Sequence, residues 1–299
     1  MIEYFSRSFF LFLYRMIKWV LHKVLGVCEL QRLCRDCPAG STRTKKIELS
    51  LKKSKYAALR RVVADDDDIT VNDAVQNIIT MKMINPDTHQ DVVEALKNCV
   101  SQTIGYRALL KEIEVLRTEA YSSENSEHEE DLLQLWSLLV PQTPLENRIT
   151  KQWQDIGFQG DDPQTDFRGM GMLGLKNLLY FSTHYSGTAR QLLSHSNHPT
   201  LGYSYAIVGI NLTSMAYHLM VDGHLKTHFY NSCVSAPNLN NFHQVYCYLF
   251  YEFDRFWISE KPDTIMEFNR IRQKFRLRII EKLEDPETIL SAKFELEVN

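Results

Sequence analysis

The sequence has few glycines and prolines and almost no net charge. Its 299 residues include 12 Gly and 9 Pro, and 44% are hydrophobic, which excludes a fibrous or low-complexity chain and indicates a globular protein. The formal net charge is −3, whereas a nucleic-acid-binding protein usually carries a basic patch on its folded body. We therefore expect no nucleic acid among its partners.

The six cysteines do not follow the pattern of a disulfide framework or of a zinc site. Three of them lie in CELQRLCRDC, residues 28–37, but no second CxxC pair completes a tetrahedral zinc site. Ordinary reduced thiols in a reducing compartment are therefore expected. Membrane-proximal S-acylation is the alternative role for Cys28, Cys34 and Cys37.

Residues 1–25 combine apolar and basic side chains without a long apolar run. Arg15, Lys18 and Lys23 interrupt the segment, whereas a membrane-spanning helix needs about 20 mostly apolar residues. Residues 1–55 hold 12 Lys and Arg against 4 Asp and Glu, which suits an anionic surface. The interpretations are an amphipathic helix on a membrane or lipid-droplet surface, a first helix docked on the body, and a mitochondrial presequence.

Helical periodicity dominates the rest of the chain. Apolar residues recur at helical spacing in residues 47–62, 75–83, 92–104, 106–116 and 265–283, and the apolar stretch 203–220 is long enough for a core helix. We predict an all-α fold. Its parts are the N-terminal helix 1–25, a helical region 26–117, a polar linker 118–131, a compact helical domain 132–290 and a tail 291–299.

The segment IGFQGDDPQTDFRGMGMLGL, residues 156–175, holds a single cation, Arg168, together with three aspartates and five glycines. We expect Asp166 to cap a following helix, which would place Arg168 in the first turn, where a cation opposes the helix dipole. Such a cation needs compensation. Either one of the aspartates pairs with it, or an anion from outside the chain does.

Motifs of a self-sufficient active site are missing. The sequence has no Walker lysine loop, no G-x-S-x-G and no H-E-x-x-H, and the aspartates lack the spacing of a calcium loop. We expect no metal and no cofactor bound by this chain. We expect the histidines of SHSNHP and GHLKTH to be loop and surface residues: His195, His198, His224 and His228.

The block W-x-x-I-G-F-Q-G-x-D-P-x-T-D-F-R-G-x-G-x-L-G-L-x-N-L-x-Y-F, residues 153–181, resembles the signature of the ELMO domain as carried by ELMO domain-containing (ELMOD) proteins. The likeness extends through GYSYAIVGINLT, YCYLFYEFDRFW and IMEFNRIRQKF and covers nearly the whole chain. It is nearest to the short members one and two of that family, rather than to the larger ELMO scaffolds.

The resemblance implies a GTPase-activating protein for GTP-bound Arf and Arf-like small GTPases. The family's D-F-R-G arginine, which is thought to be required for activity, falls on Arg168. GTP and magnesium would then belong to the partner GTPase. The alternative is a noncatalytic adaptor that binds a small GTPase or exchange factor at a membrane surface, as the larger scaffolds, which differ at the arginine, are thought to do.

The remaining site residues are expected to shape the loop. Gly157 and Gly160 permit positive φ angles, and the loop is expected to be supported, or the partner contacted, by Gln159, Asp162, Asp166, Gly157, Gly160 and Gly169. For Gln159, ordering the attacking water is an alternative role. Trp153 and Phe158 are expected to anchor the loop in the core. The resemblance and residues 1–25 together imply an intracellular protein, peripheral at the endoplasmic reticulum, lipid droplets or mitochondria.

Overall fold

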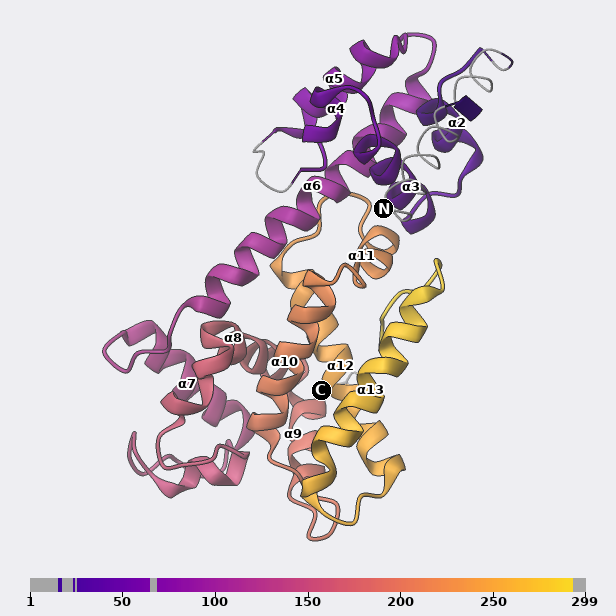
Figure 1. The fold of residues 1–299 in the computed structure, drawn as a ribbon. Helices are drawn as coiled ribbons and strands as arrows, with labels where there is room; N and C mark the ends of the chain where they lie inside the picture. The colour runs from indigo at the N-terminus through magenta and orange to yellow at the C-terminus, as the bar shows by residue number, and fades with distance from the viewer. Residues whose placement is uncertain (1–15, 18–23, 25, 65–68, 293–299) are drawn as a thin grey trace, which may run out of the picture. The chain divides into compact units, whose positions relative to one another are not determined.

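The computed structural model describes residues 16–17, 24, 26–64 and 69–292 (Figure 1). The amphipathic helix predicted over residues 1–25 therefore lies outside the described residues, apart from Met16, Ile17 and Val24. Among the residues described, no helix is both long enough and apolar enough to cross a membrane.

The chain divides into two compact units. One comprises residues 1–105 and 230–236, and the other comprises residues 106–229 and 237–299. The division falls inside helix α6 (Gln90–Thr118) and not in the polar stretch 118–131, whose second half begins α7 (Ser126–Leu139). The two helices predicted over 92–104 and 106–116 are one helix, because Gly105 costs a helix interior about 1 kcal/mol without ending it.

The first unit is built from short helices around an aliphatic core. Thr70 caps α5 by accepting a hydrogen bond from the Asp73 amide, as its residue type predicts, and α5 ends at Met83 in the left-handed conformation. The core includes Leu30, Ile47 and Leu59, each nearly inaccessible to solvent. Besides the start of α6, the helices are α2 (Glu29–Asp36), α3 (Ser41–Lys52), α4 (Ala57–Arg61) and α5 (Val71–Lys82).

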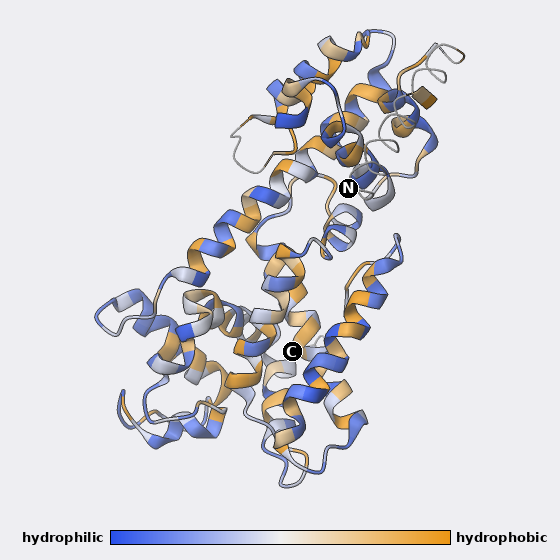
Figure 2. Cartoon of the chain, in the orientation of Figure 1, coloured by the Kyte–Doolittle hydropathy of each residue, from blue (hydrophilic) through white to orange (hydrophobic). Residues whose placement is uncertain are grey.

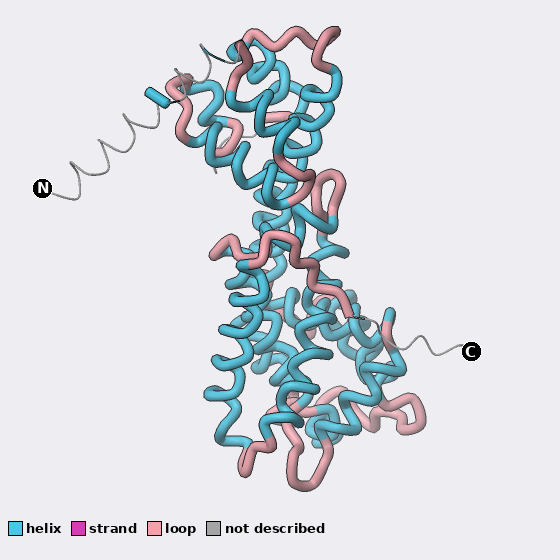
Figure 3. The backbone as a smooth tube through the Cα atoms, turned by 90° about the vertical axis from the view of Figure 1, so that its right-hand side faces the viewer, coloured by secondary structure: helices cyan, strands magenta, loops and turns pink. Residues whose placement is uncertain are grey.

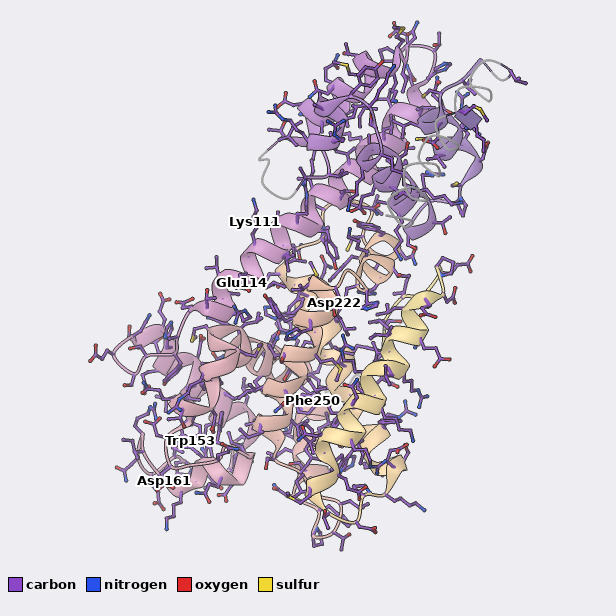
Figure 4. The ribbon with its side chains drawn as sticks, in the orientation of Figure 1. Lys111, Glu114, Trp153, Asp161, Asp222 and Phe250 are labelled. Carbon is purple, nitrogen blue, oxygen red and sulfur yellow. The ribbon has the colours of Figure 1, made fainter. Side chains whose placement is uncertain are left out.

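The second unit packs its helices around α8, which contacts α7, α9, α10 and α12. The apolar stretch 203–220 forms a core helix, α10, as predicted, and Phe250 of α12 lies against Phe181 and Tyr205 in the centre of the unit (Figure 4). Besides α7, its helices are α8 (Gly171–His184), α9 (Ser186–Ser196), α10 (Tyr205–Val221), α12 (Leu239–Glu260) and α13 (Phe268–Glu284). Helix α11 (Lys226–Ser232) begins in this unit and ends in the first, because the division falls after residue 229.

Helix α13 is amphipathic, with apolar and polar residues alternating along its ribbon (Figure 2). Ile271, Phe275 and Ile279 are buried at helical spacing, as the sequence predicts, while the other side is basic. Throughout the described ranges every regular element is a helix and no strand occurs (Figure 3), so the predicted all-α fold is confirmed.

Candidate functional site

Two short 3-10 helices, η1 (Lys151–Ile156) and η2 (Pro163–Gly169), shape the segment before α8. Asp162 is the N-cap of η2, because its side chain accepts a hydrogen bond from the Gln164 amide at 3.0 Å, and Pro163 occupies the first helical position. The cap expected at Asp166 is therefore wrong. Asp166 lies one residue before the buried Phe167, inside η2 itself.

Arg168 lies in the last turn of η2, not in the first turn of a longer helix as expected. A cation is favourable at that end of η2, but Arg168 also lies two residues before Met170, the N-cap of the longer helix α8, whose dipole opposes a cation. Its side chain is exposed, and no described residue holds it by a hydrogen bond or an ion pair. Because Phe167 is 1% exposed and fixes the turn from inside, the neighbouring guanidinium is held outward on an ordered backbone.

The three aspartates of the segment have other partners. Asp161 accepts a hydrogen bond from the Gln154 amide nitrogen at 3.2 Å, and Asp162 pairs with Arg148 at 3.1 Å. Asp166 accepts the Gln159 backbone N–H at 2.9 Å; burial raises the pKa of this carboxyl, and the nearby charge of Arg168 partly offsets that rise. An aspartate clamp on Arg168, one of the two compensations considered, is therefore not formed.

A partly buried network around Arg148, which sequence reasoning missed, supports the segment. The Arg148 Nε lies 2.6 Å from a Glu129 carboxylate oxygen, and its Nη2 donates to the Tyr121 hydroxyl at 3.2 Å. That hydroxyl also hydrogen-bonds to Glu129, and burial is the main cause that raises the Tyr121 pKa. Together with the Asp162 contact, these bonds tie residues 121–129 to the start of η2.

A row of packed aromatic rings forms the floor under the loop. Trp153 and Phe158 are both buried, with ring centroids 5.9 Å apart, and Phe158 lies 5.6 Å from Phe167. The Trp153 indole N–H donates to the Arg148 carbonyl oxygen at 2.9 Å, which joins this row to the Arg148 network. Figure 4 marks Trp153 and Asp161 in this segment. The loop thus has a rigid base.

Two glycines of the segment are required by the backbone. Gly157 has a φ of +85°, and a Cβ there would lie 2.3 Å from the Tyr205 nitrogen at the start of α10. Gly171 has a φ of +51°, and a Cβ there would lie 2.3 Å from the Glu119 carbonyl oxygen. The positive φ considered for Gly160 is not found. A Cβ at Gly169 would meet no atom within 4 Å, so the surface beside Arg168 is open.

A groove of about 340 Å³ adjoins Arg168, between η2 and the end of α6. Its lining includes Arg117 and Tyr121 besides Arg168. Arg117 forms two hydrogen bonds with Glu114, at 2.6 and 2.7 Å, and those bonds, together with one from the Tyr217 hydroxyl, lower the Glu114 pKa to about 2. Arg117 is therefore already neutralised within the chain, unlike Arg168, and Arg168 is the cation of this groove that remains to pair with an anion.

The histidines do not assemble into a metal centre. Across the described ranges no group of three His, Cys, Asp or Glu side chains could hold a metal ion. The expectation of a surface residue is wrong for His228, which is buried and accepts the Leu290 amide at 3.0 Å. His195 is partly exposed, but its Nδ1 lies 2.8 Å from the buried Asp254.

The second unit, with the loop that presents Arg168, contains most of the residues that match a known family. The chain belongs to the ELMO/CED-12 family, because its residues 111–272 match the model of that family. This confirms the family inferred from the block at residues 153–181.

Curated relatives cover nearly the whole chain. ELMO domain-containing protein 1 of Bos taurus is 49% identical over 300 residues, which span 95% of this chain and 92% of the relative. ELMO domain-containing protein 2 of Homo sapiens is 49% identical over 294 residues, spanning 97% and 98%. ELMO domain-containing protein B of Dictyostelium discoideum is 36% identical over 274 residues, spanning 90% and 94%.

Proposed function

We propose that this protein is a GTPase-activating protein for Arf and Arf-like small GTPases, and that it supplies Arg168 in trans to the bound GTP. The observation that carries the proposal is the state of Arg168. It is exposed on a capped loop and no described residue pairs with it, while all three neighbouring aspartates have other partners. The ELMO-domain resemblance supports the proposal, because the family's D-F-R-G arginine corresponds to Arg168.

The chemistry needs little more than this arginine and a docking surface. As water attacks the γ-phosphate, negative charge grows on the phosphoryl oxygens and on the leaving β–γ bridging oxygen. A guanidinium at that point stabilises the transition state, and such a residue raises the rate by roughly 10³–10⁵, which is about 4–7 kcal/mol of barrier. The partner contributes its own phosphate-binding loop, magnesium and water-positioning residue.

The loop is suited to this role because its backbone is held before a partner arrives. The Asp162 cap, the buried Phe167 and the Arg148 network leave few degrees of freedom to lose when Arg168 meets a phosphate. Asp166 fixes the backbone of Gln159, whose side chain is exposed. Gln159 is accordingly the second residue of the loop that we propose to contact the GTPase.

Residues 1–25 are proposed to bring the domain to a membrane or lipid-droplet surface, where lipid-anchored GTPases are found. Their mixture of apolar and basic side chains supports the proposal. A chain without these residues would keep its activity toward a GTPase in solution and lose vesicle binding.

Single-turnover GTP hydrolysis by a panel of Arf and Arf-like GTPases tests the activity. The full chain is added in catalytic amounts to each GTP-loaded partner, and binding to the same partners is measured in parallel. Faster hydrolysis by at least one partner supports the proposal. Binding without faster hydrolysis by any of them contradicts it and makes the protein an adaptor.

A further inference from the structure

A second groove, of about 320 Å³, lies between α10 and α13, and the proposed function makes no use of it. Its polar lining comes from three residues of each helix, and no Asp or Glu is among its described lining residues: Asn211, Ser214, His218, Arg272, Gln273 and Arg276. Residues 56–299 as a whole carry 22 Lys and Arg against 33 Asp and Glu. A groove with two arginines and no carboxylate is thus a local exception on an acidic body.

Arg272 is held in the groove by neutral partners. Its Nη1 donates to the Asn211 side-chain oxygen, and its guanidinium lies 5.5 Å from the centre of the Phe268 ring. Asn211 is fixed in turn, because its amide nitrogen donates to the Ile207 carbonyl oxygen at 2.8 Å. The guanidinium is therefore positioned without being neutralised, and a planar guanidinium in that state suits a phosphate, which accepts two parallel N–H bonds.

Arg276 lies one helical turn further along α13 and faces the same groove. Its Nη2 forms an ion pair with Asp222 at 3.0 Å, at the C-terminal end of α10 (Figure 4). One Nη is engaged there, and the other N–H groups of the fork remain for a ligand. Of the other cations of α13, Arg270 and Lys274 pair with Glu267 and Glu260, so Arg272 is the cation of the groove without an acidic partner among the described residues.

We propose that the groove between α10 and α13 binds a phosphate-bearing anion, with Arg272 as the principal contact and Arg276 as the second. The ligand class is a phosphomonoester, either on a soluble metabolite or on a lipid headgroup. The site is separate from the groove beside Arg168, and the proposal does not depend on GTPase activation.

Calorimetric titration of the full chain with inositol 1,4,5-trisphosphate, a soluble phosphomonoester, tests the site, with inorganic phosphate as competitor. Two variants probe it: Arg272→Gln, which removes the main contact, and Gln273→Glu, which places a carboxylate in the lining. The Gln273 side chain is exposed and has no hydrogen bond to a described residue, so its variant keeps the fold. Arg272→Gln should weaken binding by about tenfold or more, the worth of one charged hydrogen bond, and Gln273→Glu should weaken it through repulsion between the new carboxylate and the phosphate.

Arg278→Gln is the matched control. It removes the same charge from the same helix, but Arg278 is exposed over the Phe256 ring and does not line the groove. Its affinity should change by less than about twofold, because solvent and salt screen an exposed charge outside the site. Equal weakening by Arg278→Gln and Arg272→Gln, or failure of the wild type to bind either phosphate probe, would overturn the proposal.

Vesicles distinguish the two sources of the anion. Phosphatidylcholine vesicles containing phosphatidylinositol 4-phosphate are compared with phosphatidylcholine vesicles in which phosphatidylserine supplies the same surface charge. Phosphoinositide-selective binding that Gln273→Glu abolishes identifies a lipid headgroup. Loss of the soluble ligand alone, with vesicle binding unchanged in that variant, identifies a soluble phosphate.

Discussion

The guanidinium of Arg148 lies 3.1 Å from the carboxylate of Asp162, the residue that caps η2. This ion pair joins a residue before η1 to the start of the turn that carries Arg168. It also occupies the carboxylate of Asp162, one of the three aspartates that precede Arg168 in the segment. Arg148 thus supports the loop, and Arg168 remains exposed for a partner.

Removal of Arg148 should destabilise the second unit. Arg148→Ala leaves the Glu129 carboxylate, whose side chain is only 20% exposed, without its cation, and we expect a loss of about 2 kcal/mol in the free energy of unfolding. Arg255→Ala breaks an exposed pair with Glu252 and should cost less than about 1 kcal/mol. Urea unfolding of both variants measures the difference, and equal losses would show that the Arg148 network is not structural.

Gly157 should tolerate no side chain. In Gly157→Ala, the methyl group would lie 2.3 Å from the Tyr205 nitrogen at a positive φ, so we expect a loss of more than about 2 kcal/mol in the free energy of unfolding. Gly169→Ala is the comparison, because its φ is not positive and its Cβ meets nothing within 4 Å. Thermal unfolding should separate the two variants by several degrees, and similar midpoints would contradict the close approach.

Stability should fall as the pH drops from about 6.5 to about 4. Burial lowers the pKa of His228 and of His243 from 6.5 to about 4. Between those values the unfolded chain binds more protons than the folded chain, so each histidine contributes up to about 3 kcal/mol that is present above pH 6.5 and lost on acidification. Urea unfolding across this pH range measures the slope.

The histidine assignment has its own control. His243→Gln should reduce the pH slope, and His198→Gln, at an exposed histidine, is the comparison variant. An unchanged slope in His243→Gln would mean that His243 does not titrate as its burial requires.

The cysteines should react in two groups. Burial and the neighbouring Cys99 raise the pKa of the Cys34 thiol to about 12, and burial raises that of Cys247 well above its ordinary range. Only Cys28 and Cys233 are partly exposed. Iodoacetamide at pH 7.5, followed by peptide mass spectrometry, should modify those two first, and Cys28 before Cys233, because burial also raises the pKa of the Cys233 thiol. Rapid labelling of Cys34 would instead support an opened cluster that S-acylation could reach.

The helices that could be predicted from the sequence are those with regular apolar spacing, such as α10 and α13. The single helix α6 could not be predicted, because Gly105 between two apolar runs resembles a break, although one glycine costs a helix interior only about 1 kcal/mol. The Asp166 cap was wrong for a related reason. Asp162 and Asp166 are both suitable caps, and the choice depends on the 3-10 turn that Pro163 begins.

The candidate site divides in the same way. Arg168 stands out locally as the only cation among three aspartates. The network of Arg148, Glu129 and Tyr121 could not be predicted in this way. Arg148 contacts Glu129 and Tyr121, which precede it by 19 and 27 positions, and no local sequence pattern marks such pairs. The polar stretch that contains Tyr121 and Glu129 resembles a linker in sequence, although the folded loop depends on both side chains.

The rate of single-turnover GTP hydrolysis with Arg168→Lys beside the wild type is the most direct test of the role proposed for Arg168. Arg255→Lys, the same change at another exposed arginine of the second unit, is the control, and affinity for the GTP-loaded partner is measured for all three proteins. Lysine keeps the charge and lacks the planar fork, so we expect stimulation reduced by roughly 10²-fold or more, with partner affinity and the control unchanged. Equal stimulation by Arg168→Lys and the wild type would contradict that role.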